Sequence, residues 1–408
     1  MLAGLSSWPS VRVPGSLPAA LLAIVSTFIF TASPVRAADL ASVLAGQKNL
    51  TVFSGLLTQY PDLFADLSSV TVLAPNDAAF DKLGNWGAVS SNPDSVKSII
   101  NYHIINKLIT PSSIFKGASI FAPTKLTDPA YTNVTGGQTL ILTKDPPSGS
   151  IAVTSGFATR GTIIVEDLKF DGGLVHVIDS VMRVPGTIEQ TAREAYTDLT
   201  AFLGALYAAG IVSDFTELGN VTIFIPRSLA FQELAGTFSS MGQDQLKRVL
   251  DYHLIPKTVL HSWQFLDSTA LTTNSGGAKV NIQLDANSIY INSARIIQAD
   301  ILVDNGLVQM IDNVLNPDVP NAKPNFTAAT QTPVFDVSGA TQTGTGAATP
   351  FANDIPCTVS CLVKPTGTPG GGVQSSLSRA GVPAPRCTGV LAGAGMGLGM
   401  AIGAMIAL

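Results

Sequence analysis

Only 4 histidines occur in the 408 residues, so any chemistry that needs an imidazole must start with them. Two of them follow a tyrosine in matching stretches, "NYHII" from Asn101 and "DYHLI" from Asp251. Tyrosine and histidine are intermediate in burial, so each pair fits a core position with backbone hydrogen bonds or an exposed position that contacts a partner. Both interpretations stay open for four residues, Tyr102, His103, Tyr252 and His253.

The remaining sequence offers little for catalysis. His176 lies three residues before Asp179 in a strand-like stretch, where that spacing points the two side chains to opposite faces. No G-x-S-x-G, H-E-x-x-H or glycine-rich phosphate loop occurs. The acidic stretch "EDLKFDGG" at 166–173 lacks the regular oxygen ligands of a calcium loop and is expected to be a solvated turn. No catalytic residue, metal site or cofactor is predicted, and the chain is not expected to be an enzyme.

An internal repeat organises the middle of the chain. "TVLAPNDAAF" from Thr71 returns as "VTIFIPRSLAF" from Val221, and "GGLVHVIDSVMRVP" from Gly172 returns as "NGLVQMIDNVLNP" from Asn305. Units of this length predict two domains rather than a solenoid. We place the first domain at 39–185 and the second at 186–317.

The repeated corner "TVLAPNDAAF" predicts a strand followed at once by a helix. Pro75 ends the strand because it cannot donate to a sheet ladder, and Asn76 or Asp77 supplies the oxygen that caps the helix. In the second unit, Arg227 and Ser228 stand at these positions, and Ser228 retains a capping oxygen. Helical patterns open each unit and alternating, strand-like patterns close it, so each unit is expected to be an α+β domain.

These landmarks resemble the fasciclin, or FAS1, domain, and the resemblance covers residues 39–317. It implies two tandem domains, each a twisted β-sandwich or wedge flanked by helices, with a role in adhesion or in matrix and wall contact and without enzymatic activity. In animal relatives the Tyr-His region is associated with integrin binding. This association would map to Tyr102 and His103, and to Tyr252 and His253. His176 is replaced by Gln309 in the second unit, so the shared fold does not need that imidazole.

Residues 1–38 are expected to be a cleaved secretory signal. Arg12 provides the positive charge, 17–30 is an apolar run, and small residues precede Asp39. The alternative is a transmembrane anchor, for which the apolar run is short.

The C-terminal part predicts a stalk and a lipid anchor. Residues 318–380 are rich in Ser, Thr, Pro and Gly and are expected to form a disordered, O-glycosylated stalk. Small residues, a spacer and an apolar tail at 381–408 match a glycosylphosphatidylinositol signal, whose tail is removed. A C-terminal transmembrane helix is the alternative. The candidate attachment residues are Ser375, Ser376, Ser378 and Gly381.

Several residues are candidates for modification. In an oxidising compartment, Cys357 and Cys361 are expected to form a local disulfide, since a metal site would need further ligands nearby. Asn220 directly precedes a strand-like run, so its glycosylation is expected least of the four sequons. The N-glycosylation sequons start at Asn49, Asn133, Asn220 and Asn325.

The functional prediction is a surface protein. The net charge of -5, without a basic stripe, excludes nucleic acid as a partner. We expect a GPI-anchored protein on the outer face of the plasma membrane, or a protein of the wall or the secreted fraction. Its expected partner is a protein or polysaccharide of the cell surface, matrix or wall, and that partner can be another copy of the chain. The alternative is a structural wall component that binds polysaccharide without bridging cells. A protein of this kind should expose aromatic side chains that stack on sugar rings. Trp86 and Trp263 are the tryptophans that remain after the signal is removed.

Overall fold

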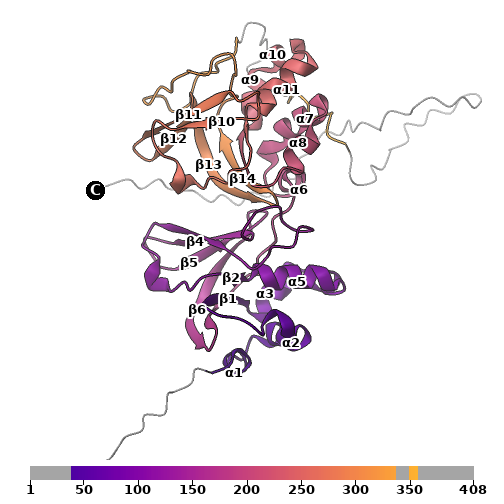
Figure 1. Ribbon diagram of the computed structural model, residues 1–408, viewed down its shortest axis with the longest axis vertical. Coiled ribbons are helices and arrows are strands. Elements are labelled where there is room, and N and C mark those ends of the chain that lie inside the picture. The colour runs from indigo at the N-terminus through magenta and orange to yellow at the C-terminus, as the bar shows by residue number, and fades with distance from the viewer. Residues whose placement is uncertain (1–37, 337–348, 357–408) are drawn as a thin grey trace, which may run out of the picture. The chain divides into compact units, whose positions relative to one another are not determined.

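The computed structural model describes residues 38–336 and 349–356 (Figure 1). The first domain opens with helices and closes with a hairpin-rich sheet. Its helices are α1 (Leu40–Ala45), α2 (Thr51–Gln59), α3 (Asp77–Leu83), α4 (Trp86–Ser90) and α5 (Pro93–Tyr102). Its strands are β1 (Val70–Pro75), β2 (Ile104–Ile105), β3 (Ser119–Pro123), β4 (Thr139–Lys144), β5 (Ile151–Thr154), β6 (Arg160–Phe170) and β7 (Gly173–Ile178).

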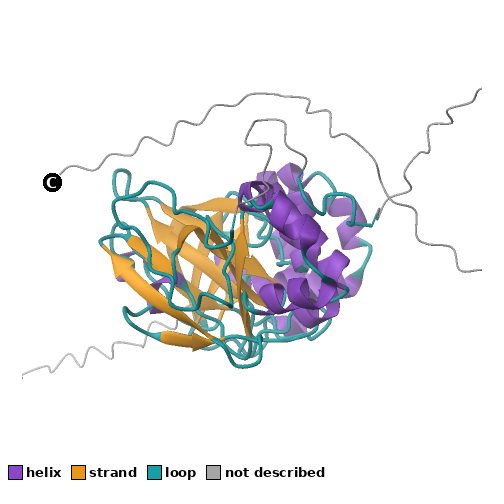
Figure 2. Cartoon of the chain, turned by 90° about the horizontal axis from the view of Figure 1, so that it is seen from above, coloured by secondary structure: helices purple, strands orange, loops and turns teal. Residues whose placement is uncertain are grey.

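The second domain repeats this order of elements. Its helices are α6 (Ile188–Glu194), α7 (Thr200–Ala209), α8 (Val212–Thr216), α9 (Ser228–Glu233), α10 (Ala235–Ser240) and α11 (Gln243–Asp251). Its strands are β8 (Val221–Pro226), β9 (Leu254–Ile255), β10 (Ala270–Thr272), β11 (Lys279–Asp285), β12 (Ser288–Ile291), β13 (Ala294–Val303) and β14 (Gly306–Ile311). The expectation of two tandem α+β domains is confirmed, and Figure 2 shows the helices gathered beside the strands.

Each sheet has seven strands and curls until it is nearly closed. The first follows the order β2-β1-β7-β6-β5-β4-β3, and the second follows β9-β8-β14-β13-β12-β11-β10. The pairs β1–β7 and β8–β14 are parallel, and the other pairs are antiparallel. A bridge between Ile105 and Thr124 brings the two edges of the first sheet together. This curling encloses an interior in each domain, separate from the layer beneath the helices.

Strand β1 explains why the run that opens the repeated corner is almost entirely apolar. Val70, Val72 and Ala74 join the core between sheet and helices, whereas Leu73 joins the core inside the curled sheet. Successive side chains of a strand point to opposite faces, so a strand between two cores is largely apolar on both faces. The exception in β1 is Thr71, whose hydroxyl donates to Lys107 O. Strand β8 divides its side chains in the same way, with Phe224 in the inner core.

The corner after β1 is built as predicted, and its two polar residues bond two different helices. Asn76 caps α3, because its Oδ1 accepts from Ala79 N at 2.8 Å. Asp77 instead reaches back to the start of α2, where its carboxylate accepts from Val52 N at 2.9 Å and from Thr51 Oγ1 at 3.0 Å. One corner therefore fixes two helices.

Part of the segment assigned to the stalk lies against the second domain, which differs from the disordered stalk that its composition predicts. Phe335, Phe351 and Ile355 pack against the core beneath the helices of that domain. We call residues 349–356 the C-terminal strap. The average composition of the segment is polar, but these few apolar side chains suffice for docking. The domain limits 39–185, 186–317 and 318–380 stay predictions.

Candidate functional site

The Tyr-His motif of the first domain lies inside the domain at the end of α5. The Tyr102 hydroxyl donates to Thr139 O at 2.9 Å. His103 Nδ1 lies 2.7 Å from Ile99 O, and His103 Nε2 accepts from Met182 N at 3.0 Å. The two side chains are 0% and 1% exposed. The hydroxyl and both ring nitrogens are therefore bonded within the domain.

The second domain repeats the same bonds with different neighbours. Tyr252 donates to Lys279 O at 2.7 Å. His253 Nδ1 lies 2.8 Å from Val249 O, and its Nε2 accepts from Leu315 N at 3.0 Å. Tyr252 and His253 are fully buried. The motif therefore has one geometry in both domains.

This geometry fixes the protonation state of both histidines. Nδ1 faces a carbonyl oxygen and must carry the hydrogen, whereas Nε2 receives an N–H and must present its lone pair. Burial lowers the pKa of His103 and of His253 to about 4, and in each ring the hydrogen bond to the carbonyl of the preceding turn opposes this shift. Both imidazoles are uncharged at neutral pH.

The motif connects two of the sequence landmarks. His103 follows the last residue of α5, while Met182 lies in the segment that leaves β7. The equivalent bond joins His253 to Leu315. The buried position is the one that the core interpretation predicts. A partner contact by the four side chains stays a prediction, and it would require each domain to open locally.

His176 and Gln309 show how a position can keep its bonds while changing residue type. His176 Nδ1 accepts from Asp167 N at 3.1 Å, and its Nε2 lies 2.8 Å from Ile109 O. Gln309 Oε1 accepts from Asp300 N at 2.9 Å, and its Nε2 donates to Leu260 O at 3.0 Å. An amide supplies one acceptor and one donor, as a neutral imidazole does. His176 makes no bond to Asp179, whose Oδ1 instead accepts from Thr162 N.

The acidic stretch at 166–173 forms the β6–β7 hairpin, and its carboxylates at Glu166, Asp167 and Asp171 are exposed, as expected for a solvated turn. Over residues 38–336 and 349–356, no group of three or more His, Cys, Asp or Glu side chains is placed to hold a metal ion.

The fourth histidine borders an exposed aromatic cleft that the sequence analysis did not single out. His261 packs against Phe121 with ring centroids 4.2 Å apart and an angle of 38° between the ring planes, and Trp263 beside it is 66% exposed. The cleft has a volume of ≈ 570 Å³, within the usual range of roughly 300–1,000 Å³ for ligand pockets. Lys257 and Asn220 also line it. Trp86 differs, because it packs on Phe80 at 4.8 Å.

The four sequons lie in different surroundings. Asn49 and Asn133 are exposed in the first domain, Asn325 is exposed in the segment that follows residue 317, and Asn220 is half-buried. Asn133 lies between β3 and β4, and its side-chain nitrogen donates to Glu217 O at 3.2 Å. Asn220 immediately precedes β8, and its side chain bonds Thr135. Glycosylation of the four stays a prediction.

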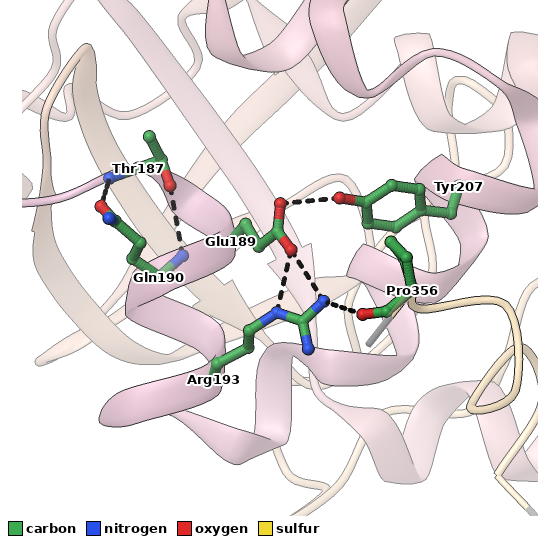
Figure 3. Close-up of polar contacts among 6 residues, drawn as sticks. All are labelled: Thr187, Glu189, Gln190, Arg193, Tyr207 and Pro356. Atoms are coloured by element: carbon green, nitrogen blue, oxygen red, sulfur yellow. Dashed lines mark hydrogen bonds and ion pairs between the residues drawn. The ribbon is translucent and has the colours of Figure 1, made fainter. Parts of the chain in front are cut away.

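The C-terminal strap is fastened to α6 by a network of polar contacts (Figure 3). Arg193 Nη2 donates to Glu189 Oε1 and to Pro356 O, at 2.7 Å in both cases. Tyr207 on α7 donates to Glu189 Oε2 at 2.6 Å. Burial, followed by the hydrogen bond to Glu189, raises the pKa of Tyr207 to about 12, so the phenol stays protonated. A capping box at Thr187 holds the start of α6.

Other predicted sites lie outside the described residues. They are the signal at 1–37, the cysteines Cys357 and Cys361, and the attachment candidates Ser375, Ser376, Ser378 and Gly381. Within the part of the chain that the structure describes, no helix combines the length and apolar character needed to cross a membrane.

Comparison with known proteins identifies the family. The sequence profile of the Fasciclin domain matches residues 26–185 and 197–317. A fasciclin-like arabinogalactan protein of Arthroderma benhamiae is 31% identical over 79% of this chain and 76% of its own length. A second, of Phaeosphaeria nodorum, is 30% identical over 69% of this chain and 89% of its own length.

Among solved structures, the FAS1 domain pair from the insect cell adhesion molecule fasciclin I is 18% identical, with a TM-score of 0.33, and the match covers 67% of this chain and 98% of that chain. Fasciclin domains are adhesion or structural modules and not enzymes. The chain, matched over more than half of its 408 residues by the two Fasciclin domain segments, belongs to the fasciclin family.

Proposed function

We propose that this fasciclin-type protein acts in cell-surface adhesion or matrix contact through its two domains, carried on a glycosylated stalk with a GPI anchor at the outer face of the plasma membrane. The observation that carries the proposal is the burial of the repeated motifs. Tyr102, His103, Tyr252 and His253 are bonded inside each domain, so a partner that binds without opening the domains would contact their outer surface.

The strap supports a tethered arrangement. Its last described residue, Pro356, is held by Arg193, and the predicted stalk and anchor follow it in sequence. A pull on the stalk would therefore act on the second domain through the strap. Many tethered copies raise the effective concentration of weak contacts, so adhesion needs no strong single site.

The test is binding of beads that carry residues 38–356 to cells that express or lack the protein. We expect saturable binding that depends on bead density. Folded protein that binds neither cells nor extracellular matrix would contradict the proposal. In intact cells, phospholipase C specific for inositol anchors should release the protein, and retention after this treatment and wall digestion would exclude the anchor.

One observation favours the alternative function, polysaccharide contact within a wall. Trp263, the Phe121–His261 pair and Lys257 surround the cleft described above, and exposed aromatic faces beside polar groups suit the apolar faces and hydroxyls of sugar rings. Under this alternative, Trp263→Ala abolishes retention on insoluble wall polysaccharide. Under the adhesion proposal, it leaves bead binding to cells unchanged.

A further inference from the structure

The side-chain nitrogens of the four sequons fall into two classes. No described residue accepts a hydrogen bond from Asn49 Nδ2 or from Asn325 Nδ2. Asn325 Oδ1 accepts from the nitrogen and hydroxyl of Thr327, the last residue of its own sequon, at 3.1 and 2.7 Å. Both nitrogens are therefore available to a sugar.

Asn133 differs because its bonds cross from the first domain to the second. Its backbone nitrogen donates to Asp304 O at 2.8 Å, and its side-chain nitrogen donates to Glu217 O at 3.2 Å. Its own carbonyl oxygen accepts from Asn220 N at 3.2 Å. One sequon of the first domain thus contacts two segments of the second, residues 217–220 and Asp304.

Asn220, in the second domain, in turn bonds a residue of the first domain. Its Oδ1 accepts from Thr135 N at 2.8 Å, and its Nδ2 donates to Thr135 Oγ1 at 2.9 Å. Thr135 is the hydroxyl residue of the Asn133 sequon. Asn220 has a φ of 57°, a left-handed conformation that asparagine tolerates better than most residues. The two sequons therefore bind each other.

Further contacts between the domains surround these two sequons, beside the cleft that Thr135 and Asn220 help to line. Gln138 Nε2 donates to Val303 O at 3.0 Å, and Thr132 Oγ1 donates to Asp304 O at 3.1 Å. A methyl group added to Gly219 would lie 2.6 Å from Asn133 O, closer than side-chain carbons approach an oxygen. A sugar attached at Asn220 would have to displace such contacts.

We propose that Asn133 and Asn220 form a polar clamp between the two domains and stay unglycosylated in the folded protein, whereas Asn49 and Asn325 carry the N-linked glycans. Attachment would form a bond from Nδ2 to C1 of the sugar, release one amide proton and expel the pyrophosphate of a lipid-linked oligosaccharide. The nitrogen keeps one hydrogen after attachment, so at Asn220 the sugar would take the place of the other hydrogen, close to the contact with Thr135. The inference concerns the fold and does not depend on the adhesion proposal.

The first experiment maps glycan occupancy in the full chain secreted from a eukaryotic host. Peptide N-glycosidase in ¹⁸O-labelled water converts each glycosylated Asn to labelled Asp, which mass spectrometry locates. We expect label at positions 49 and 325 and none at 133 and 220. Label at 133 or 220 in the folded protein would overturn the clamp, and unlabelled 49 and 325 would overturn the glycan assignment.

The second experiment tests the clamp itself by amide hydrogen exchange at Asn133 and Thr135. Asn220→Gly keeps the left-handed backbone but removes the side chain, and Thr135→Val removes the hydroxyl. Each variant should raise exchange at these amides at least tenfold. Thr135→Ser, which keeps the hydroxyl, and Asn49→Gln should leave exchange unchanged. Unaltered protection in Asn220→Gly and Thr135→Val would overturn the proposal.

Discussion

The two domains use different side chains at several equivalent positions to make the same hydrogen bonds to backbone groups. In the first domain, Asp77 accepts from the start of α2, whereas in the second, Ser228 Oγ accepts from Ala201 N of α7 at 3.3 Å. His176 and Gln309 likewise supply the same donor and acceptor. The comparison teaches that the fold requires the bonds and accepts any side chain that can make them. The Tyr-His pair keeps both its residue types and its bonds, and so does the threonine in the strand before it. Thr71 Oγ1 donates to Lys107 O and accepts from Ile109 N, as Thr222 Oγ1 does with Thr258 O and Leu260 N.

The domains differ most where the strap lies. In α2 the central Gly55 is exposed, and a methyl group there would meet open space. In α7 the corresponding Gly204 is buried, and an added methyl group would collide with the backbone oxygen of Phe351. An all-round apolar helix such as α7 must be covered on every side. The second domain is thus completed by chain that follows it.

The largest expected effect is the loss of either motif histidine. His103→Ala and His253→Ala should each lower the free energy of unfolding by about 3–5 kcal/mol. The change leaves a cavity, and it leaves a buried N–H and a buried carbonyl without a hydrogen-bond partner. Chemical denaturation measures this loss. The matched control is His176→Gln, which copies the second domain and should cost less than about 1 kcal/mol. If all three variants lost the same free energy of unfolding, His176 and Gln309 would not be equivalent in the two domains.

Acid should weaken both domains in the same pH window. The pKa of His103 and of His253 falls from 6.5 in the unfolded chain to about 4 in the folded protein, so the unfolded state binds more protons in between. This stability is fully present above pH 6.5 and is lost as the pH falls to about 4, by about 3 kcal/mol for each histidine. Urea denaturation across that range measures it. A constant free energy of unfolding would contradict the account.

The same glycine substitution should have opposite signs in the two domains. Gly204→Ala should destabilise the second domain by about 1–3 kcal/mol, because the strap must move away from α7. Gly55→Ala should stabilise the first domain by about 0.5–1 kcal/mol, since alanine favours a helix. Thermal unfolding of both variants decides the sign. Equal effects would show that the strap does not complete the second domain.

The smallest expected effect concerns the side chains that cap α2 and α7 from a distance. Asp77→Ala and Ser228→Ala should each cost about 1 kcal/mol, because each removes an acceptor from a helix start. Asp77→Ser should restore most of the loss, as the second domain uses serine. A serine that restores nothing would show that the carboxylate has a separate role.

Local patterns predicted much of this fold and little of its long-range contacts. The proline corner and the alternating strands follow from short-range rules, and Asn76 caps α3 as expected. The helical pattern around His103 did not reveal its burial, because the partner Met182 is distant in sequence. The polar composition around Phe351 gave no sign that the strap packs on the second domain. The sequon at Asn220 likewise does not show that its side chain contacts the other domain.

The most direct test of the central claim, that the Tyr-His motifs are internal supports in both domains, is an NMR titration of the imidazole nitrogens. We expect His103 and His253 to stay neutral, with hydrogen on Nδ1, and to titrate only near about pH 4. Signals from either ring that titrate near 6.5, the value of an unperturbed histidine, would place it in solvent and contradict the account.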